Sequence, residues 1–257
     1  MLLPSPLVPG RFLKRYQRFF ADVRLEDDSV VTAHCANSGS MKTCLVPNGR
    51  VWLSSNSDPK RKLKYTWELA EVQGAWAYVH PVRANRLVRE AIEENVITEL
   101  RGYDEIHAES AFGPHTRFDF LLRNGSVKHY VEVKNVTLGL ADGRSSFPDA
   151  VSVRATKHLR ELVNVVRSGS RASLVFCASR TDATSVEPAD DIDPEYGRAL
   201  RWAANEGVEL LAYRVVVELD SPAPKVTLKY RIPVLLADDP PREPGTKSAR
   251  AGLPNGG

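Results

Sequence analysis

The 257-residue chain lacks the features that mark membrane-spanning, secreted and zinc-binding proteins. No stretch approaches the roughly 18 consecutive apolar residues that a membrane helix needs, and the first residues carry no basic region ahead of an apolar run, as a secretory signal does. Only three cysteines occur, without the CxxC spacing of a zinc site. These absences predict a cytoplasmic protein whose thiols stay reduced.

A strong overall charge is also missing, because the formal net charge is only +3. The charge is unevenly distributed, however. Through Arg83 there are 12 Lys and Arg against 7 Asp and Glu, a net +5, whereas residues 84–236 carry 20 against 22, a net −2. This asymmetry predicts two units with different tasks, and it assigns a polyanionic partner to the first of them.

Residues 1–83 are predicted to form a small β-barrel of the OB type. Short segments with strand-like alternation are separated by turn residues, and about five of them fit into some 70 residues. The predicted strands span residues 19–25, 30–34, 51–53, 67–72 and 76–79.

Basic and aromatic residues interleave in this first unit, as they do on surfaces that bind single-stranded nucleic acid. On such surfaces the bases stack on aromatic rings and the phosphates contact Lys and Arg. The predicted DNA-binding residues here are Arg15, Arg18, Lys60, Arg61, Lys62 and Lys64. In the alternative interpretation the aromatics form the barrel core and the lysines a solvated loop. The residues alone leave both open.

Residues 84–236 are predicted to form an α/β domain with a mixed sheet, because helical and strand-like segments alternate along the chain. Helices are expected at 85–100, where Asn85 can act as the N-cap, and at 152–166 and 194–206. After these come Pro, Gly and charged residues, which predict a disordered tail over 237–257.

A predicted hairpin carries the candidate chemistry of this second domain. It joins Arg117–Phe120 to Tyr130–Lys134 through a turn at Asn124-Gly125. With that two-residue turn, Asp119 lies opposite Tyr130 and Arg117 opposite Glu132. Side chains alternate across a strand, so Asp119, Glu132 and Lys134 then share one face.

Two carboxylates and a lysine on one face are what a metal-dependent phosphodiesterase needs. Asp119 and Glu132 would hold a hard divalent cation, Mg²⁺ or Mn²⁺, and Lys134 would stand where water meets the scissile phosphate. In the alternative interpretation, Arg117 and Glu132 form an ordinary cross-strand ion pair and Lys134 is a solvated strand residue.

Several motifs resemble the prokaryotic sugar fermentation stimulation protein (SfsA) family, in order from about Pro9 to Leu236. The resemblance implies an OB-type N-terminal domain and a C-terminal domain like the PD-(D/E)XK nucleases. It also implies DNA binding and a link to the regulation of sugar-utilisation genes. The matching motifs are NSGSM at 37–41, PKRKLxYTWE at 59–68, NRLV at 85–88, RFD at 117–119, YVEVKNVTL at 130–138, FPDA at 147–150, KHLxEL at 157–162 and DPEY at 193–196.

The resemblance also implies roles for individual residues. Asp119 matches the acidic residue of the nuclease core, and Glu132 and Lys134 match its (D/E)-x-K. Glu90, on the preceding helix, is the implied third metal ligand, and Lys157 the residue that faces the phosphate. One departure is Ala155 where the family usually has Gly, which alters the backbone freedom before Lys157.

Three functions are therefore considered. The first is Mg²⁺-dependent hydrolysis of DNA, and the second a regulator that binds DNA and keeps the nuclease fold without cutting. The third, an RNA- or protein-interaction module using only the barrel, leaves the Asp/Glu/Lys set unexplained. No helix-turn-helix or zinc pattern is present in the sequence, so DNA binding is expected to depend little on base sequence. Monomer and homodimer both remain open.

Overall fold

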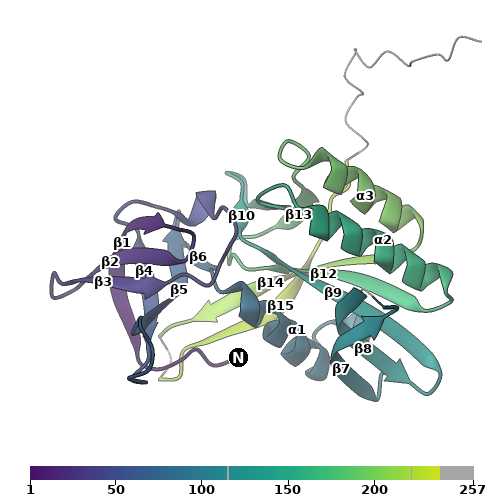
Figure 1. Cartoon of the computed structure of the whole chain (residues 1–257), viewed down its shortest axis with the longest axis horizontal. Coiled ribbons are helices and arrows are strands. Elements are labelled where there is room, and N and C mark those ends of the chain that lie inside the picture. Colours follow the sequence, from purple (N-terminus) through teal and green to yellow (C-terminus); the bar gives the residue numbers. More distant parts are fainter. Residues whose placement is uncertain (115, 221, 238–257) are drawn as a thin grey trace, which may run out of the picture.

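The computed structural model describes residues 1–114, 116–220 and 222–237. A β-barrel built from the first part of the chain lies beside a larger unit of sheet and helices (Figure 1). Among the described residues no helix is long and apolar enough to cross a bilayer. The tail predicted to be disordered lies, apart from Ala237, outside the described residues.

The first unit is a barrel closed by five strands. The strands run in the order β3-β2-β1-β4-β5-β6, and a parallel pairing of β3 with β5 closes the first five of this order. This confirms the predicted OB-type barrel. The strands are β1 (Leu7–Tyr16), β2 (Phe20–Leu25), β3 (Val30–His34), β4 (Arg50–Ser55), β5 (Tyr65–Val72) and β6 (Ala75–Tyr78).

The aromatics of the barrel divide between its core and its surface. Phe12 stacks on Trp67 with ring centroids 5.0 Å apart inside the buried core, whereas Tyr16 and Phe19 stay exposed. Phe12 thus belongs to the barrel core, as one interpretation predicts, whereas Tyr16 and Phe19 lie on the surface, as the other predicts. Sequence reasoning missed β1 because Pro9 and Gly10 interrupt its alternation.

The second unit is a mixed α/β domain, which confirms the predicted fold class. Its sheet runs β15-β14-β12-β9-β8-β7, with β9, β12 and β14 parallel and the outer strands antiparallel. Its elements are α1 (Ala84–Glu93), β7 (Glu105–Phe112), β8 (Thr116–Asn124), β9 (Val127–Val136), α2 (Val153–Arg167), β12 (Arg171–Ala178), α3 (Pro194–Asn205), β14 (Glu209–Glu218) and β15 (Lys225–Ile232), with a side sheet of β10 (Leu138–Gly139), β11 (Arg144–Phe147) and β13 (Ser185–Pro188) and 3₁₀ turns η1 (Lys42–Cys44), η2 (Pro81–Arg83) and η3 (Thr98–Leu100).

Helices cover both faces of the large sheet, which explains the almost continuous apolar run of β12. Helix α1 packs on the face that presents Val131 and Val133, and α2 and α3 lie together on the other face with Tyr130 (Figure 1). The side chains of β9 thus alternate as predicted. Glu132 and Lys134 belong to the α2 face, and Glu132 accepts a hydrogen bond from α2.

The first predicted helix is shorter than expected. It ends at Glu93 instead of Leu100, because Asn95 adopts a left-handed conformation (φ 57°) and η3 follows. Asn85 does not cap it, since it lies within the helix and its side chain donates to Asp119. Strands β7 and β15 were not predicted; both lie at edges of the sheet and mix charged with apolar residues.

Two of the family-like motifs hold the barrel and the α/β domain together. The Asp149 carboxylate accepts hydrogen bonds from the Met41 amide (3.1 Å) and the Ser40 hydroxyl (3.3 Å). Glycine at position 39 allows this contact, because a Cβ there would lie 2.5 Å from Asp149 Oδ2 and would displace the carboxylate. Asp149 thus joins the two units. The N-cap of the following helix α2 is Ser152, whose side chain accepts from the Ala155 amide.

Candidate metal site and nucleic-acid surface

The β8–β9 hairpin turns one residue later than predicted. Asn124 pairs with Val127, so the loop is Gly125-Ser126, and Tyr130 faces Leu121 instead of Asp119. Because both loops contain two residues, the register moves by two and the paired residues from Phe120 to Asn124 keep their predicted faces. The change brings Asp119 towards Glu132. The predicted pairing of Arg117 with Glu132 is therefore wrong.

Glu132 is buried and held by two nitrogen donors. Its Oε1 accepts from Lys134 Nζ (2.6 Å) and from His158 Nδ1 on α2 (2.5 Å). Burial raises the pKa of the Glu132 carboxyl, but the hydrogen bond from His158 and the charge of Lys134 outweigh burial and leave the pKa below its ordinary value. Glu132 is thus a carboxylate at neutral pH.

Asp119 lies next to Glu132, just beyond the last paired residues of the ladder. Its Oδ2 accepts from the Val133 amide (2.7 Å) and its Oδ1 from Asn85 Nδ2 (2.6 Å). Burial and the nearby charge of Glu132 raise the pKa of Asp119 above its ordinary value. The two carboxylates therefore repel each other, and a divalent cation between them would relieve this repulsion.

The donor set fits a hard cation with few protein ligands. Among residues 1–114, 116–220 and 222–237 no group of three or more His, Cys, Asp and Glu side chains is placed to hold a metal. Mg²⁺ is commonly bound through one or two carboxylates, with waters and substrate phosphates completing its octahedron. Asp119 and Glu132 are such a pair, so the residues present fit Mg²⁺ or Mn²⁺.

The structure does not bring Glu90 to this pair. Its carboxylate is engaged by the amino group of Met1 (2.5 Å) and by Arg86 Nε (3.0 Å). These partners lower the pKa of Glu90 despite its partial burial. Its predicted place as a third metal ligand is therefore corrected. Asn85, earlier on the same helix, is the α1 residue that contacts Asp119.

The raised pKa of Asp119 predicts how metal binding depends on pH. Metal binding needs both carboxylates ionised, so Mg²⁺ affinity should fall as the pH drops through the raised pKa of Asp119. The loss should begin at a higher pH than an ordinary aspartate would give. Titration calorimetry with Mg²⁺ at stepped pH checks this, with Asp119→Asn as the variant that should bind weakly throughout. An affinity independent of pH down to the ordinary range of Asp contradicts it.

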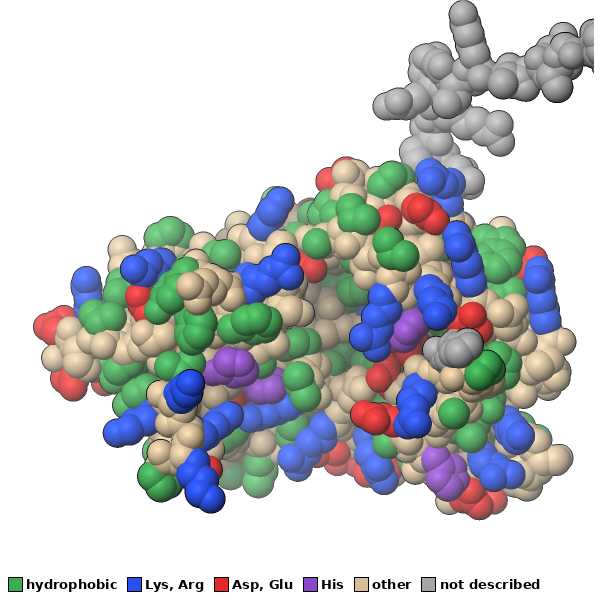
Figure 2. Space-filling view, viewed as in Figure 1, with side chains coloured by type: hydrophobic (Ala, Val, Ile, Leu, Met, Phe, Trp, Pro, Cys, Tyr) green, Lys and Arg blue, Asp and Glu red, His purple; other side chains and the backbone are tan. Residues whose placement is uncertain are grey.

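A cationic pocket lies next to Glu132. It has a volume of about 510 Å³, and its lining includes Lys157 and His158 of α2 together with Arg154 and Arg117. Figure 2 shows Lys and Arg side chains gathered around a histidine beside the hollow between the two halves of the molecule. Lys157 thus stands where a phosphate could approach Glu132. Arg117 joins it there.

The barrel residues predicted to bind DNA do not all remain available. Arg15 donates to backbone carbonyls of Arg18, Asn37, Gly39 and Ser40, so it holds the loop that contacts Asp149. Its predicted DNA contact is therefore corrected to a structural role. The others have exposed side chains: Arg18, Lys60, Arg61, Lys62 and Lys64.

The last four of these residues lie on residues 56–64, which we call the cationic loop. Side chains at its start shape it. Asn56 Oδ1 accepts from the Asp58 amide (2.8 Å) and Asp58 Oδ1 from the Lys60 amide (2.9 Å). These Asx turns present the lysines to solvent.

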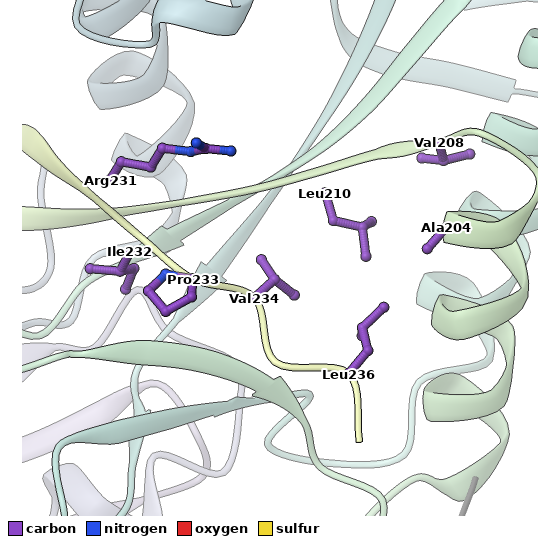
Figure 3. Close-up of a pocket in the computed structure, with 8 residues that line it drawn as sticks. All are labelled: Ala204, Val208, Leu210, Arg231, Ile232, Pro233, Val234 and Leu236. Atoms are coloured by element: carbon purple, nitrogen blue, oxygen red, sulfur yellow. The ribbon is translucent and has the colours of Figure 1, made fainter. Parts of the chain in front are cut away.

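A larger pocket of about 610 Å³ carries no comparable chemistry. It lies between α3, β14 and the segment after β15, and Leu210, Val234 and Leu236 point into it (Figure 3). Arg231 is its only charged lining residue among those the structure describes. It lacks the acidic groups that mark the hairpin site.

Two residues of the hairpin site had weak sequence signals. In the sequence His158 stands only as part of the KHLxEL motif, without a predicted role, and Asn85 is predicted to be an N-cap. Both lie on helices packed on opposite faces of β9, so only the assembled sheet shows that they meet Glu132 and Asp119.

The fold and the site define a class: an OB-type barrel joined to a PD-(D/E)XK nuclease-like domain. The SfsA N-terminal OB domain matches residues 13–79, and the sugar fermentation stimulation protein RE domain matches residues 82–221. The chain belongs to the sugar fermentation stimulation protein family, as its motifs predicted.

Relatives support this assignment over almost the whole chain. The sugar fermentation stimulation protein homolog of Pelobacter propionicus is 55% identical over 236 residues, which cover 92% of this chain and 100% of that one. The homolog of Geotalea daltonii is 51% identical with the same coverage. The solved structure of Pyrococcus furiosus SfsA in complex with Ca²⁺ is 26% identical, with a TM-score of 0.81 over 91% of this chain and 98% of that one.

Proposed function

We propose that this protein binds DNA and hydrolyses its phosphodiester bonds with the help of Mg²⁺ or Mn²⁺. One observation carries the proposal: Asp119, Glu132 and Lys134 converge beside a pocket lined by Lys157 and Arg154. Acidic oxygens next to cationic side chains match a site that takes a metal ion and a phosphate together.

Each residue has a role that follows from its contacts. Asp119 and Glu132 would hold the cation, which when bound lowers the pKa of a water and offsets charge on the phosphate. Lys134 Nζ lies 2.6 Å from Glu132, where it can orient that water and stabilise negative charge. His158 fixes the Glu132 carboxylate, and Lys157 and Arg154 hold the DNA phosphates.

The solved structure of Pyrococcus furiosus SfsA contains Ca²⁺, which supports our proposal that the present protein also binds a divalent cation. Calcium prefers oxygen ligands, as Mg²⁺ does, although it accepts more of them. The relative therefore supports the class of ion, a divalent cation, and not the residues that bind it.

A non-catalytic regulator of sugar-utilisation genes is the second candidate. It is favoured by the fact that Glu132 Oε1 accepts from two protein donors, Lys134 and His158. Such a protein would keep the fold and bind DNA through phosphates alone.

The two candidates are separated by incubating the protein with supercoiled plasmid and with linear single- and double-stranded DNA. We expect nicking or degradation in Mg²⁺ or Mn²⁺ and none in EDTA. Binding of the same DNAs in EDTA without cleavage in any metal would contradict the catalytic proposal and leave the regulator.

The cationic loop predicts a salt-dependent contribution to DNA binding. The triple variant Lys60→Ala, Lys62→Ala, Lys64→Ala should flatten the plot of log affinity against log salt by about two units for single strands, since each phosphate contact adds about 0.7. Anisotropy titrations across salt concentrations measure this slope.

A matched control removes three other exposed cations: Arg24, Lys128 and Lys229. Its slope should stay near the wild-type value. Equal slopes for the two triple variants would move the DNA-binding surface away from the cationic loop.

A further inference from the structure

A second polar pocket lies on the barrel, beside the segment that leads into α1. Its volume is about 340 Å³, and it is lined by the ends of β3 and β4, the beginning of β5, the cationic loop and η2. None of the metal-site residues lines it. Figure 2 shows histidine side chains beside Lys and Arg on the barrel half, next to the hollow.

The chemistry of this pocket suits an anion. His34 and His80 both line it, and Arg61 of the cationic loop and Arg83 of η2 add positive charge. The Arg83 charge is balanced by the fully buried Glu68, whose carboxylate accepts from Arg83 (3.0 Å) and from Ser54 (2.7 Å).

The protein itself engages the side chains of Arg61 and His80 less than it engages Arg83. Arg61 has an exposed side chain. His80 Nδ1 is buried and has no hydrogen-bond partner among the described residues. A buried polar atom without a partner costs free energy, and a ligand would meet the rest of the His80 ring, which lines the pocket.

An aromatic ring completes the pocket. Phe19 lines it and is 46% exposed, although it is a large hydrophobic side chain. Exposed rings next to cationic groups stack with nucleobases. The volume lies at the lower end of ligand pockets, which suits one nucleotide and not a longer segment of strand.

We propose that this pocket binds a nucleotide that carries a terminal phosphate at the end of single-stranded DNA, with the phosphate on Arg61, His34 and His80 and the base against Phe19. The proposal rests on the DNA function proposed above and adds a specific ligand end. A terminal phosphate has three free oxygens and a second negative charge, which an internal phosphodiester lacks.

The pocket is connected to the metal site through a few residues. Arg83 immediately precedes α1, and Asn85 in the first turn of α1 donates to Asp119 (2.6 Å). A strand end held in this pocket is therefore placed by the same segment that positions a catalytic carboxylate.

The histidines give this binding a pH dependence. Burial and the charge of Arg83 and of His34 lower the pKa of His80 to about 4, and burial and the charge of Arg61 lower that of His34. A bound phosphate raises both values and so takes up protons, next to the other charged groups at the pocket, Arg61, Arg83 and Glu68, of which Glu68 has its own pKa raised by burial. The preference for a phosphorylated end should therefore grow from about pH 7.5 to about pH 6.5.

The test compares short single-stranded oligothymidylates with and without a 5′- or 3′-phosphate by anisotropy in EDTA, so that no cleavage occurs. We expect about tenfold tighter binding of one phosphorylated form, the size of a charge-assisted hydrogen bond. Arg61→Ala should abolish this preference, whereas Lys62→Ala, on the same loop but outside the pocket, should weaken all forms equally and keep it.

Several outcomes overturn the proposal. Equal binding of the three forms by the wild-type protein does so, and so does a preference that survives Arg61→Ala. Competition by free thymidine monophosphate as strong as that of the phosphorylated strand would make the ligand a mononucleotide instead of a strand end. If no oligonucleotide binds at all, the proposed DNA function fails first, and equilibrium dialysis with the mononucleotide then tests the pocket separately.

Discussion

Replacing Glu132 with alanine is expected to lower metal-dependent DNA cleavage by at least about 100-fold, because loss of a partner one shell further out already costs 10–100-fold at metal sites. The variant removes the carboxylate that Lys134 and His158 both contact. It therefore removes a proposed cation ligand and also leaves Lys134 and His158 without the acceptor that they share. Initial rates on supercoiled plasmid in Mg²⁺ measure the effect.

Two matched variants show whether this loss is specific to Glu132. Glu90→Gln removes the carboxylate that Met1 and Arg86 engage, and Glu93→Ala removes an exposed one that pairs with Arg89. Both should cut DNA at close to the wild-type rate. Cleavage by Glu132→Ala at the wild-type rate, or an equal loss in Glu90→Gln, contradicts the assignment. Thermal unfolding of each variant separates loss of activity from loss of fold.

The faces of the paired hairpin residues could be predicted because strand parity survives an error in register, but the contacts of Asp119 could not. A loop at Asn124-Gly125 shifts the predicted register by two residues, yet the residues paired from Phe120 to Asn124 keep their predicted faces. The pairing ends before Asp119, whose carboxylate contacts β9 at the Val133 amide and α1 at Asn85. The exact pairing depends on which residues enter the turn. Asn124 instead stays in the strand and donates its side-chain amide to the Gly102 carbonyl, a contact that is not local in sequence.

Residue type was a poor guide where the chemistry depends on packing. The family resemblance implies Glu90 as a metal ligand, but its position on α1 brings it to Met1 and Arg86. Arg15 was chosen as a phosphate contact because it is basic, but its guanidinium is used by the loop carbonyls at 37–40. In both cases the deciding partner comes from a segment that sequence patterns do not place.

The contact between the two units was equally hidden. The NSGSM and FPDA motifs are more than 100 residues apart in the chain, and each could have been explained as a turn. In the folded protein Asp149 accepts from Met41, and its carboxylate lies where a Cβ at position 39 would be. The barrel and the hairpin carboxylates are thus held in a fixed relation, as the proposed function requires if one unit binds the DNA strand and the other cuts it.

Replacing Asn85 with aspartate is expected to destabilise the metal-free protein by about 2 kcal/mol and to make its stability depend strongly on Mg²⁺. The change removes the donor that Asp119 Oδ1 accepts from (2.6 Å), which costs about 1.5–3 kcal/mol for a charged acceptor. It also adds a third carboxylate beside two that already repel each other. Thermal unfolding in EDTA and in Mg²⁺ measures both effects.

The comparison with Asn85→Ala makes this prediction specific. Alanine removes the same hydrogen bond but adds no charge, so Mg²⁺ should raise its unfolding temperature only as much as it raises that of the wild type. In Asn85→Asp, a third oxygen ligand should tighten the cation and so increase the stabilisation by bound metal. If Mg²⁺ stabilises the two variants equally, the cation does not bind at Asp119. If Mg²⁺ raises the unfolding temperature more in Asn85→Asp than in Asn85→Ala and the wild type, the cation binds at Asp119. This result does not depend on whether the protein cuts DNA.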